Sequence, residues 1–147
     1  MGFFQRLFSR WKRQESEHKT EPEEQKKSFL LYIGKVPEIL TYMRRARGIP
    51  RKKLELVLVD HEEYPAYQIA QVMELLMRDL NLFYLVTERP ETFEELAEEA
   101  LEQRGLLVTF LDRTQMDHLP GNLVLDLHDW EKQLDIISAV SYNTVIM

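Results

Sequence analysis

Acidic and imidazole side chains follow several apolar runs of this 147-residue sequence, at points where strands are expected to end. These segments are 60–63, 87–89, 112–114 and 126–129. If the runs form parallel strands of one sheet, the segments meet at one edge, where ligands bind in open α/β sheets. Carboxylates suit Mg²⁺ or Mn²⁺, and an Asp–His pair suits acid–base catalysis. The candidate metal ligands are Asp60, Asp112, Asp126 and His128.

The same residue types have a structural role where a helix follows a strand. Asp, Thr and Glu accept hydrogen bonds from the first amides of the helix and complement its dipole. The five glycines never fall in a phosphate-loop spacing, no G-x-S-x-G nucleophile motif occurs, and there is no cysteine for thiol chemistry. The sequence therefore favours helix capping over a catalytic or metal site, and we expect no cofactor.

The elements that must position these side chains alternate between strands and helices. Helical periodicity and breaker residues predict helices from Val36-Pro37, over 66–80, from Thr92 to Gly105 and over 130–140. A helix running on from Phe29 is the alternative to the first strand. This alternation predicts an α/β fold with a small doubly wound, mostly parallel sheet and helices on both faces. The expected strands are 29–33, 54–59, 82–86, 106–111, 123–127 and 144–147.

Residues 14–28 contain five Glu, three Lys, one Pro and no large apolar residue. A segment of this composition cannot bury a core, so we expect a charged, flexible tether. The tether would separate an isolated amphipathic basic helix at 1–13 from a single α/β domain at 29–147.

The first thirteen residues combine an apolar helical stripe with positive charge that no acid interrupts. Basic helices with aromatic residues on one face bind the interface between water and hydrocarbon, which favours a membrane surface. Docking of the helix into a groove of a protein is the alternative. The stripe is Phe3, Phe4, Leu7, Phe8 and Trp11, and the cations are Arg6, Arg10, Lys12 and Arg13.

Charge divides unevenly along the chain. Residues 1–53 hold 14 of the 19 Lys and Arg against 6 acids, whereas residues 54–147 hold 5 against 19. A second basic cluster ends the first part and suits an anionic lipid surface or an acidic partner. Nucleic acid is disfavoured as a ligand because the acidic remainder would repel a duplex. The cluster is Arg44, Arg45, Arg47, Arg51, Lys52 and Lys53.

These patterns predict a non-catalytic regulatory or scaffolding protein, cytoplasmic and peripherally attached to the inner face of a membrane, that presents its α/β domain to a protein partner. One short segment attaches weakly, so a homodimer, a partner or the second basic cluster would be expected to strengthen the attachment. One alternative is a metal-dependent hydrolase or phosphotransferase that uses the acidic edge of the sheet. Another is a degenerate receiver-like signalling domain with Asp60 in the phosphoacceptor position.

Overall fold

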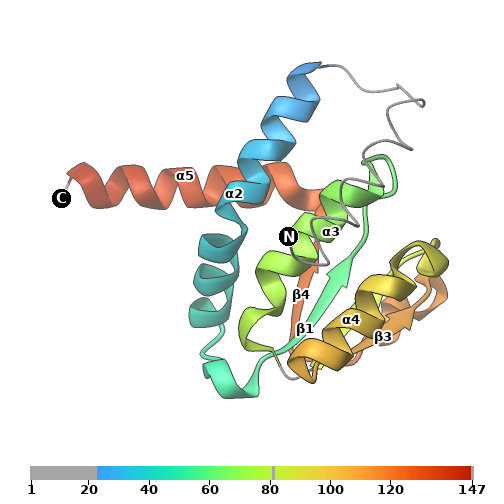
Figure 1. Cartoon of the computed structure of the whole chain (residues 1–147). Helices are drawn as coiled ribbons and strands as arrows, with labels where there is room; N and C mark the ends of the chain where they lie inside the picture. Colours follow the sequence, from blue (N-terminus) through green and yellow to red (C-terminus); the bar gives the residue numbers. More distant parts are fainter. Residues whose placement is uncertain (1–22, 81, 147) are drawn as a thin grey trace.

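The computed structural model describes residues 23–80 and 82–146 (Figure 1). The expected amphipathic helix at 1–13 and residues 14–22 of the expected tether lie outside this range. Helices and strands alternate in the order α2 (Glu23–Ala46), β1 (Glu55–Val59), α3 (Ala66–Leu76), β2 (Leu82–Val86), α4 (Glu94–Arg104), β3 (Leu107–Leu111), β4 (Leu123–Asp126) and α5 (Trp130–Ile146). Short 3-10 helices join them: η1 (Arg51–Lys53), η2 (Met77–Asp79), η3 (Pro90–Phe93), η4 (Arg113–His118) and η5 (Leu127–Asp129).

The four strands form one sheet in the order β3-β2-β1-β4, and all three pairings are parallel. Each strand is an almost continuous apolar run, as expected of strands that are covered on both faces. The central strand β1 pairs Leu56 with Phe83 of β2 and with Leu123 of β4. The expected α/β class, with a mostly parallel sheet and helices, is thereby confirmed.

The helices α2, α3 and α4 pack on one face of the sheet, and α5 packs against α2. Leu56 and Leu58 of β1 and Phe83 and Leu85 of β2 point into this main core and are fully buried. The helices close the core because each carries apolar residues at helical spacing. Their buried contributions include Ile39 of α2, Ile69 and Met73 of α3, Leu96 and Ala100 of α4, and Trp130 and Ile137 of α5.

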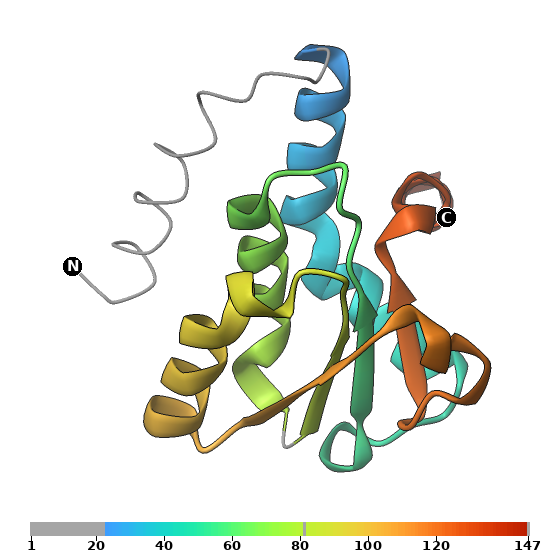
Figure 2. The same ribbon diagram turned by 90° about the vertical axis from the view of Figure 1, so that its right-hand side faces the viewer.

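The other face of the sheet is covered by the connection from β3 to β4, which contains η4 and no α-helix. Leu119 of this connection packs against a smaller apolar cluster that includes Val57 and Val86. Gly121 passes so close that a Cβ atom there would lie 2.6 Å from the backbone oxygen of Glu55. The α-helix that we expected to cover this face is therefore replaced by the connection with η4, which Figure 2 shows on the side away from α2, α3 and α4.

One long helix replaces the strand that we expected at 29–33. The helix α2 runs from Glu23 to Ala46 with Pro37 inside it, so residues 23–28 of the expected tether are helical as well. Phe29, Tyr32 and Val36 are all fully buried, and their spacing follows the helical period. Their burial in the main core stabilises the helix despite the backbone hydrogen bond that Pro37 cannot donate.

The last helix is also longer than expected. α5 runs without interruption from Trp130 to Ile146, so residues 144–146 are helical, and the closing strand that we expected there does not form. No Gly or Pro occurs after Trp130, so nothing in the sequence ends the helix early. Met147 lies outside the described residues.

Aromatic and polar contacts fix α2 against α5. The ring of Phe29 stacks on Tyr64 at 4.0 Å and meets Trp130 edge-on at 5.4 Å. The Tyr32 hydroxyl donates a hydrogen bond of 2.8 Å to Gln133 Oε1, and burial, with a smaller contribution from Asp126, raises the pKa of this hydroxyl. Within the described range, no helix is long and apolar enough to cross a bilayer.

Candidate functional site

The carboxyl ends of the four parallel strands meet at one edge of the sheet, which we call the strand-end rim (residues 60–64, 87–89, 112–114 and 126–129). The sequence correctly placed the acids, the two histidines and the arginines of this rim. The structure shows which of these side chains contact one another and which contact only their own loop.

Asp60 is fully buried and tied to the segment that follows β2. Its carboxylate accepts hydrogen bonds from Arg89 Nε at 2.9 Å, Arg89 Nη2 at 3.1 Å and Thr87 Oγ1 at 2.8 Å. The Arg89 guanidinium also donates to the backbone oxygen of Tyr64 at 3.0 Å and lies 5.7 Å from the centre of the Phe93 ring. A carboxylate with these partners is held as an internal ion pair, not presented to a metal or a phosphoryl group.

His61 follows β1 and His128 follows β4, and the centres of the two rings lie 4.4 Å apart at the rim. Arg113 Nη2 lies 3.2 Å from His128 Nε2 and 2.9 Å from Glu62 Oε1. Because a guanidinium can only donate, this contact requires Nε2 of His128 to be the acceptor. The backbone amide of Arg113 donates to Glu88 Oε1 at 3.1 Å, so one arginine connects segments that follow β1, β2 and β4.

His61 is largely buried beneath this network. Burial and the neighbouring His128 lower the pKa of His61, and three nearby carboxylates (Glu63, Asp60 and Asp126) act in the opposite direction. Its Nδ1 atom is buried and has no hydrogen-bond partner within the described residues. The fold therefore favours the neutral form of this imidazole.

Asp112 and Asp126 cap the short helices that follow their strands. The Asp112 carboxylate accepts hydrogen bonds from the backbone amide and the hydroxyl of Thr114, and Gln115 Oε1 accepts from the Asp112 amide at 3.1 Å in return. Asp126 Oδ1 accepts from the His128 amide at 2.9 Å. The capping interpretation is thus correct for these two residues. Within the described residues, no group of three or more His, Asp or Glu is arranged to hold a metal ion.

The second basic cluster lies at the opposite end of the sheet from the rim. Arg44, Arg45 and Arg47 lie at or just beyond the end of α2, and Arg51, Lys52 and Lys53 form η1 immediately before β1. Arg44 Nη1 donates to the backbone oxygen of Ile49 at 2.8 Å and so closes the turn between the two groups. The other five side chains are exposed at this end of the molecule.

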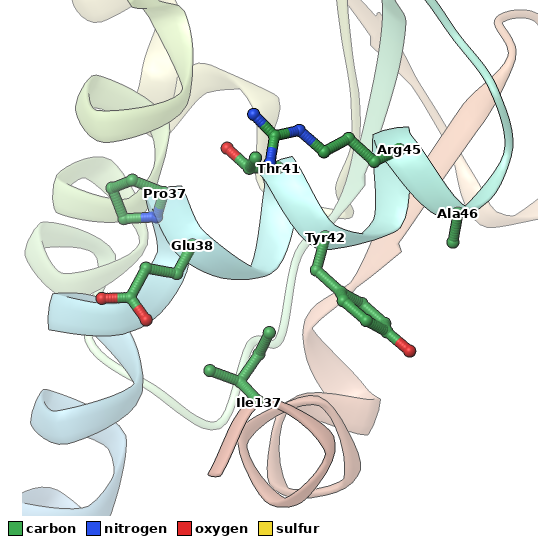
Figure 3. Close-up of a pocket in the computed structure, with 7 residues that line it drawn as sticks. All are labelled: Pro37, Glu38, Thr41, Tyr42, Arg45, Ala46 and Ile137. Atoms are coloured by element: carbon green, nitrogen blue, oxygen red, sulfur yellow. The ribbon is translucent and has the colours of Figure 1, made fainter. Parts of the chain in front are cut away.

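A groove of about 630 Å³ lies between α2 and α5 (Figure 3). The groove was not predicted from the sequence, because the residues that line it come from helices about a hundred residues apart. The signal that was present is Tyr42, an aromatic residue on the polar side of α2 that is 41% exposed. The lining residues are Pro37, Glu38, Thr41, Tyr42, Arg45, Ala46 and Ile137.

The structure thus has three separate candidate regions. They are a rim of internally paired side chains, an exposed basic cluster and a groove. No protein-family model, curated protein or solved structure matches this chain. The residues themselves are therefore the basis for inferring the function.

Proposed function

We propose that this protein is a non-catalytic regulatory or scaffolding protein, attached to the inner face of a membrane by residues 1–13, that presents its α/β domain to a protein partner. The observation that carries the proposal is the pattern of that segment. Aromatic and aliphatic residues at helical spacing would enter the interface, and the four cations beside them would contact lipid phosphates.

The second basic cluster supports the same proposal. Five of its six side chains are exposed, next to the end of α2. Each cation near an anionic bilayer contributes about 1 kcal/mol of attraction. A surface of this kind would add to the weak attachment of one short segment.

The contacts at the strand-end rim support a non-catalytic role. Asp60 is neutralised by Arg89, and Asp112 and Asp126 accept hydrogen bonds from their own loops. These contacts hold the rim together without leaving a converging set of acids for substrate. Titration of the full chain with Mg²⁺ and Mn²⁺ should therefore give no heat of binding. Heat that disappears in Asp126→Asn would instead favour the metal-dependent enzyme.

Membrane attachment is tested by sedimentation with vesicles that contain phosphatidylglycerol, and with vesicles of phosphatidylcholine alone. The full chain should pellet with the anionic vesicles, whereas a variant lacking residues 1–13 should stay in the supernatant. Equal pelleting of the two proteins would contradict the proposal.

A matched pair of charge reversals distinguishes the effect of the basic cluster on vesicle binding from the effect of net charge. Lys52→Glu removes a cation of the cluster and adds an anion, so vesicle affinity should fall by roughly tenfold or more. Lys132→Glu makes the same change on exposed α5 and should have a smaller effect. Equal losses would show that only net charge matters.

A further inference from the structure

The groove between α2 and α5 carries one acid and one base of α2, Glu38 and Arg45, toward opposite ends of one helical face. Six of its seven lining residues lie on α2, and they occupy positions that are mirrored about the midpoint between Thr41 and Tyr42. We propose that the groove is filled by a second copy of this chain, with the two α2 helices packed antiparallel about a two-fold axis at that midpoint.

A two-fold interface uses the same surface of both copies, so the surface must complement itself. In this arrangement each lining residue of α2 is level with another lining residue of the second copy. The acid of the groove then meets its base twice, once on each side of the axis, and the two aromatic rings lie near the centre. The level pairs are Glu38 with Arg45, Thr41 with Tyr42 and Pro37 with Ala46.

The side chains are positioned for such contacts. Figure 3 shows Glu38 and Tyr42 on the side of α2 that faces α5, and Arg45 and Thr41 on the side of α2 away from α5. Glu38 lies 3.6 Å from Lys35 Nζ within its own helix, and both side chains of this pair are well exposed. An exposed pair of this kind contributes little, so the carboxylate is able to accept Arg45 of a second copy.

Apolar side chains of the two helices that form the groove also lack cover in the single chain. Leu30, Leu31 and Tyr42 of α2 and Ile136 of α5 are between 41% and 58% exposed. Ile137 is buried, but the next two residues of α5 are exposed and the helix continues to Ile146, projecting from the sheet (Figure 1). Four of the seven large apolar side chains that are exposed among the described residues lie on these two helices, and exposed apolar surface of this kind suits a protein interface.

A second copy suits the charges of the groove better than residues 1–13 do. The lining contains one acid and one base, so it is electrically balanced. The N-terminal segment carries four cations and no acid, and it would leave most of them unpaired against Arg45. A second α2 brings one acid and one base in reversed order, which pairs every charge.

The inference does not depend on membrane attachment, so it is tested in solution without lipid. Sedimentation equilibrium of the full chain should show a dimer. Glu38→Arg and Arg45→Glu should each raise the dissociation constant at least about a hundredfold, because like charges then face each other at both ends of the interface. The double variant Glu38→Arg/Arg45→Glu restores opposite charges and should recover the dimer. Glu98→Arg, on the exposed surface of α4, is the matched control and should leave the dimer intact.

A cross-link gives a second measurement that does not alter charge. The chain has no cysteine, and a disulfide needs Cα atoms within about 7 Å of each other. In the proposed dimer Thr41 lies beside the two-fold axis, so the two copies of this residue come close together. Thr41→Cys should therefore form a covalent dimer on mild oxidation, whereas Glu98→Cys at the same concentration should not. A monomeric full chain, charge reversals without effect, or a double variant that stays monomeric would overturn the inference. So would a monomer that becomes dimeric when residues 1–13 are deleted, since those residues would then be the occupant of the groove.

Discussion

At the scale of single residues, Asp60 shows what sequence reasoning could and could not establish at the rim. The end of β1 was correctly located, and so were Thr87 and Arg89 after β2. The ion pair that joins them was not predicted, because it depends on β1 and β2 being neighbours in the sheet and on the bend of the chain after Val86. An acid at the end of a strand has the same appearance in the sequence whether it binds a metal or an arginine.

The Asp60–Arg89 pair allows a prediction about stability. The Asp60 side chain is fully buried and the Arg89 side chain is only 22% exposed, so Arg89→Met leaves a buried carboxylate without its cation. The free energy of unfolding should fall by about 3–5 kcal/mol. Urea denaturation measures this loss. The double variant Asp60→Asn/Arg89→Met removes the charge as well and should be more stable than Arg89→Met. If the two variants unfold alike, the pair does not stabilise the fold in this way.

His61 makes stability depend on pH in a defined direction. Burial, with His128 beside it, lowers the pKa of His61 in the folded state, whereas an unfolded histidine titrates near pH 6.5. Below that pH the unfolded chain binds a proton before the folded chain does, so stability decreases as the pH falls, by up to about 1.4 kcal/mol per pH unit. His61→Phe should flatten the curve of unfolding free energy between pH 7.5 and 5.5. His118→Gln, at an exposed position on η4, should keep the wild-type slope.

At the scale of elements, the four strands of the sheet were predictable because each is a short apolar run bounded by polar or turn residues. The helix α2 was divided wrongly because Gly34 and Pro37 usually interrupt regular structure. Tertiary packing outweighed that local signal, since Phe29, Tyr32 and Val36 all reach the main core from one helical face. The groove could not be predicted from the sequence, because it exists only where α2 and α5 come together.

Two glycines should respond to the same substitution with opposite signs. Gly121 has φ +89°, and an added Cβ would lie 2.6 Å from the Glu55 backbone oxygen and 3.0 Å from a methyl group of Val57. Gly121→Ala should therefore destabilise the protein by at least about 2 kcal/mol. Gly34 is exposed inside α2 with nothing within 4 Å of an added Cβ, so Gly34→Ala should stabilise by about 0.5–1 kcal/mol. Thermal melts of the two variants should shift in opposite directions, and a shared direction would contradict this account of the connection.

At the scale of the whole molecule, the two segments that we propose to contact the membrane come before and at the end of α2 in the sequence. The helix has 24 residues and is therefore about 36 Å long, with the basic cluster at its end. Residues 14–22 can span at most about 30 Å. Residues 1–13 and the basic cluster can therefore contact one bilayer together when α2 lies roughly along its surface. The rim would then be held to the side, where a partner can approach it.

The strand order has a consequence for synthesis of the chain. During translation β1, β2 and β3 leave the ribosome in sequence and can pair as each helix between them forms. The other edge of β1 keeps unpaired backbone groups until residues 123–126 arrive, although four of the five β1 residues are buried in the finished fold. A nascent chain that stalls before Leu123 therefore leaves one edge of an apolar strand open to pairing with other chains.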